Sequence, residues 1–371
     1  MSAIRFVHTD FLRLASPISG VAAPPTWLLQ LATAGVRHAV RNVIETALTQ
    51  RADFLFIAGS ICDSPEDLES AAHWLNEQFA PLRREGIRIV AVADDQRTSE
   101  ALQRICDVVI NRSESLHAST DAGGQIELTT NGRLGHAINE LVITTDSRAT
   151  LTQHQRGQLH YHASPSLRAS DHHDQRSRQE TLTRSAGAVQ PINSTETGDY
   201  GCLVVDADFQ QATLESSFVA SNPIRFASEK LNLTELTSAD RLVNEIAQAS
   251  KSLQRASGQT VIVDWIVNAP MESDAHEVSN LFEHHLLGRL RNHLESGHQG
   301  VWPRKIRFRE TASLQLACAD SAAVEEYFDV VTGSVTTRES DGFRVTASLL
   351  RGSDGVSEEL PVGLQMLAEA A

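Results

Sequence analysis

Three short runs of mainly apolar residues near the start of the chain constrain its fold more than any other feature. They are Ile4–Val7, Phe54–Ala58 and Ile87–Ala93, and each ends in a glycine or polar loop. Short apolar runs bounded in this way are typical of buried strands. Between them, residues 36–50 carry apolar side chains at helical spacing, and a second helix is predicted to begin after the capping residue Ser64. Strands and helices that alternate over short links predict an α/β fold with a largely parallel sheet.

The rest of the chain predicts further units. A polar stretch, residues 144–193, is predicted as a long loop that closes on a strand at 200–206. Helices and strands then alternate again, which indicates a second, smaller α/β unit. We therefore predict a core over residues 1–225, a smaller unit over 226–325, and a tail of strands and a short helix over 326–371.

Composition narrows the class of protein. The net charge is −15, because 47 Asp and Glu outnumber 32 Lys and Arg. This surplus argues against a protein that coats nucleic acid, although it allows a local basic groove. The N-terminus lacks the apolar segment of a signal peptide, and no apolar run approaches the about 20 residues of a membrane helix. The four cysteines form no CxxC pair and are predicted to be reduced and mostly buried. We expect a cytoplasmic protein.

Chemistry is expected in the loops at the carboxyl ends of the strands, as in other open α/β sheets. These loops resemble those of the calcineurin-like metallophosphoesterases, most nearly the bacterial SbcD/YhaO branch of DNA repair exonucleases. Residues 5–17 (RFVHTDFLRLASP) are similar to that branch's RFLHTADLHLGSPF, and residues 53–63 (DFLFIAGSICD) to its DFVLIAGDLYD. Residues 93–97 (ADDQR) stand where the family has GNHD. Residues 196–204 (ETGDYGCLV) and 223–226 (PIRF) resemble its ETGxxGC and PVRW segments.

The resemblance covers residues 4–226 and, in outline, 227–325. It implies a metallophosphoesterase-type sandwich of layered sheets flanked by helices, followed by a capping-like α/β unit. The family reaction uses two Mn, Fe or Zn ions that generate a hydroxide nucleophile and hold the phosphate oxygens. By the same resemblance, the natural partner is an SMC-like coiled-coil ATPase.

The chain departs from the family where the metal ligands should stand. Phe11 and Arg13 replace the Asp and His of the DxH motif, and Ser60 replaces the bridging Asp. Asp63, which is not a ligand, is kept. The Asn and His of GNHD fall on Asp94-Asp95 or on Asp95-Gln96. The first of the family's later histidines falls near Thr144-Thr145. The segment that corresponds to YxALGHxH lacks the glycine and both histidines. The vestigial pocket is thus predicted to comprise Asp10, Phe11, Arg13, Ser60, Asp63, Asp94, Asp95 and Gln96.

These departures predict a degenerate, non-catalytic protein that needs no metal cofactor and acts as a partner or scaffold. Three arrangements of the pocket stay open at this point. Arg13 with Asp63, Asp94 and Asp95 forms an ion-pair network that fills the former metal cavity, which is the arrangement we favour. Alternatively, Asp10 turns inward through a bulge and supports a relocated metal site in an active phosphodiesterase or exonuclease. In the third, Arg13 and Ser60 bind the anion of a phosphate or nucleotide sensor.

The polar stretch also holds clustered histidines and arginines. The histidines His154, His160, His162, His172 and His173 are predicted to be solvated loop residues. The stretch is also the arginine-rich part of an acidic chain, so we expect a weak contact with a nucleic acid or with an acidic partner protein there. The candidate contact residues are Arg148, Arg156, Arg168, Arg176, Arg178 and Arg184.

Overall fold

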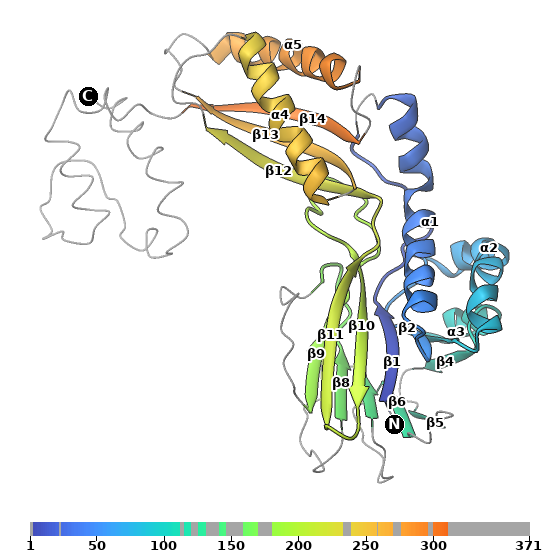
Figure 1. The fold of residues 1–371 in the computed structure, drawn as a ribbon. Helices are drawn as coiled ribbons and strands as arrows, with labels where there is room; N and C mark the ends of the chain where they lie inside the picture. The colour runs from blue at the N-terminus through green and yellow to red at the C-terminus, as the bar shows by residue number, and fades with distance from the viewer. Residues whose placement is uncertain are drawn as a thin grey trace, which may run out of the picture. The chain divides into compact units, whose positions relative to one another are not determined.

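The computed structural model confirms the predicted α/β class, with three sheets flanked by helices (Figure 1). The structure describes residues 3–21, 24–111, 115–119, 125–130, 141–145, 159–169, 180–232, 239–257, 259–269, 276–295 and 300–310. The predicted tail, residues 326–371, lies outside the described residues. The chain divides into two compact units, of which the first comprises Met1–Ala227, Leu253–Ile262 and Gln299–Trp302 and the second the remainder. No helix among the described residues is long and apolar enough to cross a membrane.

The first sheet contains the three strands predicted from the apolar runs. Its order is β11-β10-β1-β2-β3-β4, in which β1 to β4 run parallel and β10 and β11 are antiparallel to their neighbours. The strands are β1 (Ala3–Thr9), β2 (Phe54–Ile57), β3 (Arg88–Ala93), β4 (Val108–Asn111), β10 (Gly201–Asp208) and β11 (Thr213–Ala220). The carboxyl ends of β1, β2 and β3 therefore meet at one edge, where the candidate site was expected.

The second sheet contains strands that the sequence analysis missed. Its order is β5-β6-β7-β8-β9, parallel from β6 onward. The strands are β5 (Ser115–Ser119), β6 (Gln125–Thr129), β7 (Leu141–Thr144), β8 (Leu159–Ala163) and β9 (Thr181–Arg184). The prediction of one long loop over residues 144–193 was wrong, because β8 and β9 lie within it. In β8, Leu159, Tyr161 and Ala163 point into the core and alternate with histidines, a period of two that the polar composition concealed.

The two sheets pack face to face and helices cover the other face of the first sheet. Phe6, Phe56 and Val205 of the first sheet share a buried cluster with Ile143 and Tyr161 of the second. The opposite face of the first sheet packs against three helices. They are α1 (Thr26–Thr49), α2 (Pro65–Arg84) and α3 (Gln96–Leu102). This arrangement is the layered sandwich that the resemblance implied.

Two of these helices test the sequence analysis. In α2 the predicted cap is confirmed, since the Ser64 hydroxyl accepts from Asp67 N at 3.1 Å. Helix α1 begins at Thr26, well before residue 36, and runs through Gly35. A Cβ at Gly35 would lie 2.8 Å from the Cδ1 atom of Ile18, so the glycine allows a close contact that outweighs its weak helix propensity.

The third sheet has the order β12-β13-β14. Its strands are β12 (Ile224–Asn232), β13 (Thr260–Ala269) and β14 (Val301–Glu310), and the helices after β12 and β13 are α4 (Ala239–Ser257) and α5 (His276–Glu295). The helix and strand alternation predicted after residue 226 is confirmed. Helix α4 buries a stripe that includes Leu242, Val243 and Ile246, as its strongly amphipathic sequence requires.

Candidate functional site

The loop after β1 turns Asp10 into the protein interior. His8 and Asp10 are fully buried, and their spacing of two residues places both on the side of Phe6, between the two sheets. One carboxylate oxygen of Asp10 accepts hydrogen bonds from Ser185 Oγ at 2.8 Å, Gly187 N at 3.0 Å and Ser166 N at 3.1 Å. The other carboxylate oxygen lies 2.8 Å from His8 Nε2. Asp10 is therefore enclosed by donors of its own chain.

A tyrosine from the second sheet completes this buried group. Tyr161 OH lies 2.8 Å from His8 Nδ1, and the hydroxyl is wholly buried. Burial raises the pKa of Tyr161 well above its usual value, and the Asp10 charge adds to the effect, so the hydroxyl stays protonated and donates. We infer from the Tyr161 contact that His8 accepts at Nδ1 and carries its hydrogen on Nε2. His8 Nε2 and the nearby Asp10 oxygen are 2.8 Å apart but are not aligned for a hydrogen bond, and both atoms are buried. The side chains of Tyr161, His8 and Asp10 thus form a buried polar group that solvent does not reach.

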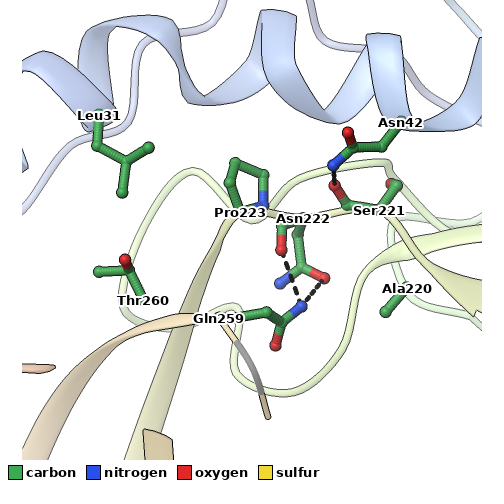
Figure 2. A pocket seen from close by; sticks show the side chains of 8 residues that line it. All are labelled: Leu31, Asn42, Ala220, Ser221, Asn222, Pro223, Gln259 and Thr260. Atoms are coloured by element: carbon green, nitrogen blue, oxygen red, sulfur yellow. Dashed lines mark hydrogen bonds between the residues drawn. The ribbon is translucent and has the colours of Figure 1, made fainter. Parts of the chain in front are cut away.

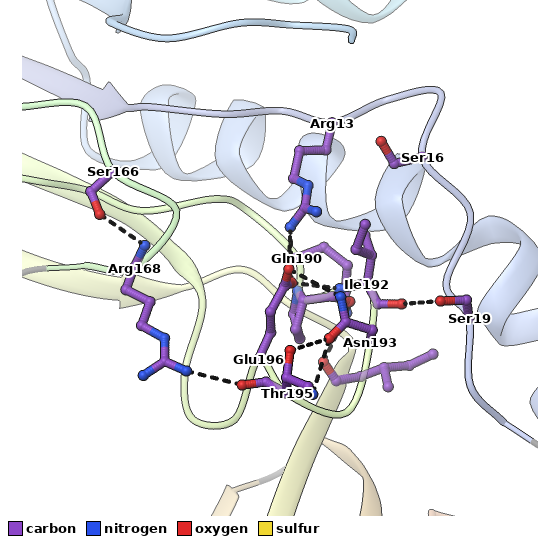
Figure 3. A network of polar contacts seen from close by, with 12 residues as sticks. Arg13, Ser16, Ser19, Ser166, Arg168, Gln190, Ile192, Asn193, Thr195 and Glu196 are labelled. Atoms are coloured by element: carbon purple, nitrogen blue, oxygen red, sulfur yellow. Dashed lines mark hydrogen bonds and ion pairs between the residues drawn. The ribbon is translucent and has the colours of Figure 1, made fainter.

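Arg13 pairs with a residue that the site prediction left out. Its Nη1 donates to both carboxylate oxygens of Glu196, at 2.9 and 2.8 Å, and both side chains are only 12% exposed (Figure 3). Glu196 also accepts from Ile192 N at 2.9 Å and Asn193 Nδ2 at 3.3 Å. The predicted network of Arg13 with Asp63, Asp94 and Asp95 was wrong. Backbone pairing around Phe11 brings the distant Glu196 loop to Arg13, which the order of residues does not reveal.

The other residues of the vestigial pocket serve local structure. Asp63 accepts from Ser16 Oγ at 2.6 Å, and Ser60 O accepts from Leu12 N at 3.0 Å. Asp95 caps α3, and the hydrogen bond from Thr98 N lowers the pKa of its carboxyl. Gln96 donates to Glu100 at 3.0 Å, and Asp94 is exposed. Phe11 is half-buried and lies against Gly59.

The two metal ions implied by the resemblance do not fit these residues. Phe11 offers no donor atom, and Arg13, where the resemblance implies a metal ligand, carries a fixed positive charge that is paired with Glu196. One oxygen of Asp10 accepts three hydrogen bonds from the chain, and the other lies beside His8 Nε2 inside the protein. In the part of the chain that the structure describes, no group of three or more His, Cys, Asp or Glu is placed to hold a metal ion.

Little of the predicted arginine and histidine cluster falls within the described residues. Arg184 is buried and donates to Ser216 Oγ at 3.2 Å, so its prediction as a contact residue was wrong. Arg168 is exposed and donates to Thr195 O at 2.9 Å (Figure 3). His160 and His162 lie on β8 within 3.1 and 2.8 Å of Thr144 Oγ1, so the solvated-loop prediction was wrong for both. Outside the described residues lie Arg148, Arg156, Arg176, Arg178, His154, His172 and His173.

The described cysteines are free and buried, as predicted. They are Cys62, Cys106 and Cys202, and burial raises the pKa of each thiol to about 12. Thiols that stay protonated at neutral pH are poor nucleophiles, so none of the three is a candidate for covalent catalysis. Cys318 lies outside the described residues.

A cavity of about 380 Å³ lies away from the strand-end loops, within the first unit (Figure 2). Its lining side chains are all uncharged: Leu31, Asn42, Ala220, Ser221, Asn222, Pro223, Gln259 and Thr260. Asn42 Nδ2 donates to Ser221 O at 2.7 Å, and Gln259 Nε2 donates to Asn222 Oδ1 at 2.7 Å. With its amide donors tied to the chain and no cationic group, this cavity does not suit a phosphate ester.

The interaction energy of the Arg13–Glu196 pair can be measured. In a double-mutant cycle with Arg13→Ala and Glu196→Ala, we expect a coupling energy of about 1–3 kcal/mol, since the pair is mostly buried and charge-assisted. The matched control is the exposed pair Arg97–Glu66, for which no coupling beyond the error of the measurement is expected. Urea unfolding of the single and double variants measures both values. Equal coupling in the two pairs would contradict the structural role of Arg13.

Comparisons with known proteins give a distant match over part of the chain. No protein-family model matches the chain. Over 92 residues the chain is 27% identical to the uncharacterized metallophosphoesterase YhaO of Bacillus subtilis (strain 168). The match covers 25% of this chain and spans only 22% of the length of that relative. This distant homology supports a relationship to the metallophosphoesterase superfamily.

Proposed function

We propose that this chain is a non-catalytic relative of the SbcD/YhaO-like DNA repair exonucleases, with its metal pocket converted into a structural polar network. The observation that carries the proposal is the buried pair of Arg13 and Glu196. In the resemblance, Arg13 stands at a metal-ligand position, and a guanidinium there repels a divalent ion. Without the ions, the family's route to a hydroxide nucleophile is lost.

The two competing arrangements of the pocket have less support. A relocated metal site needs Asp10 to offer oxygens to an ion, but its carboxylate is buried among Ser166, Ser185, Gly187 and His8. An anion pocket at Arg13 and Ser60 needs an uncompensated cation, but the charge of Arg13 is neutralised by Glu196. Neither arrangement supplies the chemistry it requires.

A protein of this kind would act in the cytoplasm as a partner or scaffold. By the resemblance, the candidate partner is an SMC-like coiled-coil ATPase. The net charge of −15 supports a protein partner over DNA, because DNA binding gains most of its affinity from neutralised phosphates.

Metal content and hydrolysis together test the proposal. We expect the purified chain to hold no stoichiometric Mn, Fe or Zn by elemental analysis. We also expect no manganese-dependent cleavage of single- or double-stranded DNA, because Phe11, Arg13 and Ser60 lack the required donors. Two bound ions per chain, with turnover that is lost in Asp63→Ala or Asp95→Ala, would overturn the proposal. Turnover that survives in both variants and co-purifies with two bound ions per chain would also overturn the proposal, because a relocated site at Asp10 uses neither residue.

A further inference from the structure

Two arginines of α1 lie against one tryptophan of α2. The Cζ atoms of Arg37 and Arg41 are 5.3 and 5.7 Å from the ring centroid of Trp74. Arg41 Nε also donates to Gln78, one turn beyond Trp74, at 2.9 Å. Arg37 and Arg41 are one helical turn apart, and the partly buried Trp74 packs against the core. The two guanidinium groups are thus held in place before any ligand arrives.

These arginines are exposed and lack an acidic partner among the described residues. Other arginines of the first unit do pair with carboxylates, including Arg5 with Asp206, Arg83 with Asp107 and Arg97 with Glu66. Stacking on an aromatic ring uses the face of a guanidinium and leaves N–H groups at its edge, which suit the two oxygens of a carboxylate. The surface formed by Arg37, Arg41 and Trp74 is therefore an organised cationic site in an acidic chain.

We propose that this surface binds a short acidic peptide segment of a partner protein. Two exposed carboxylates border it: Glu45, one turn after Arg41 on α1, and Glu77, next to Gln78 on α2. A nucleic acid carries a charge at every nucleotide and would meet these carboxylates, whereas a segment with one or two Asp or Glu side chains would not. The surface gives the proposed partner role a place on the protein, but it stands independently of whether the chain hydrolyses phosphate esters.

The test uses a fluorescein-labelled octapeptide of glycine and serine that carries two glutamates, the full chain, and fluorescence anisotropy at low ionic strength. We expect Arg37→Gln/Arg41→Gln to weaken peptide binding by about fivefold or more, because two charge-assisted contacts are lost. The matched control, Arg88→Gln/Arg104→Gln, removes the same charge from two other exposed arginines and should bind like the wild type. Arg37→Lys/Arg41→Lys keeps the charge but not the planar groups, and should bind more weakly than the wild type.

Several results would overturn the proposal. They are no binding of the two-glutamate peptide by the wild type, an equal loss in the Arg37/Arg41 and control variants, or wild-type binding by the lysine variant. Tighter binding of labelled octathymidylate through the same two arginines would identify a nucleic-acid site instead. Circular dichroism of each variant verifies that the helices are intact, and none of these readouts depends on metal content or DNA cleavage.

Discussion

Replacing Asp10 with alanine is expected to lower the free energy of unfolding by about 3–5 kcal/mol. The carboxylate is fully buried and accepts from Ser166 N, Ser185 Oγ and Gly187 N, while His8 Nε2 lies 2.8 Å from it. Alanine would remove the acceptor of the buried Gly187 N–H and of Ser166 N, and would leave Ser185 Oγ with Arg168 O as its acceptor. The largest loss is expected at Gly187, because its N–H stays buried without an acceptor.

Urea unfolding of two further variants isolates this effect. Asp10→Asn keeps the shape but points an amide N–H₂ group at other donors, and we expect it to cost about 2–4 kcal/mol. Asp95→Ala also removes a carboxylate, but from the exposed cap of α3, and should lower the stability much less than Asp10→Ala. If Asp10→Ala and Asp95→Ala were equally stable, the buried group around Asp10 would not hold the strand-end loops together.

The second large effect is expected at Gly187. Its φ of +77° is left-handed, and a Cβ there would lie 2.6 Å from the backbone nitrogen of Ala169. Gly187 O also accepts from Asp10 N at 3.3 Å, and its own N–H donates to Asp10. We expect Gly187→Ala to cost about 3 kcal/mol or more, because the backbone at Ala169 must move and the hydrogen bonds to Asp10 move with it.

Gly86 provides a matched control. Its φ of +78° is nearly the same, but nothing lies within 4 Å of an added Cβ. Gly86→Ala should therefore show only the conformational cost of a left-handed alanine, about 1 kcal/mol. Urea unfolding of both variants separates backbone conformation from crowding. Similar losses of stability would mean that the contact between Gly187 and Ala169 is not rigid.

The sequence predicted the main strands and helices of the first unit more fully than the contacts between side chains. The apolar runs that became β1, β2 and β3, and the cap at Ser64, are local patterns that a single segment reveals. The alternation of side chains along a strand, continued one residue past the end of β1, places His8 and Asp10 on the same side. This signal was not used in the sequence analysis. By contrast, β8 was missed because its polar positions carry His160 and His162, so its alternation looked like a loop.

The chain by itself determined the strands β1, β2 and β3 and the residue types of the loops that follow them, including Phe11, Arg13 and Ser60, which carry neither a carboxylate nor an imidazole. Only the tertiary structure decided the partners of those residues. Arg13 meets Glu196, and Asp10 meets Ser185 and Gly187, across more than 170 residues of sequence. The physical reason is that periodicity reports which side of an element is buried, whereas ion pairs and hydrogen bonds depend on which distant loops the packed sheets bring together.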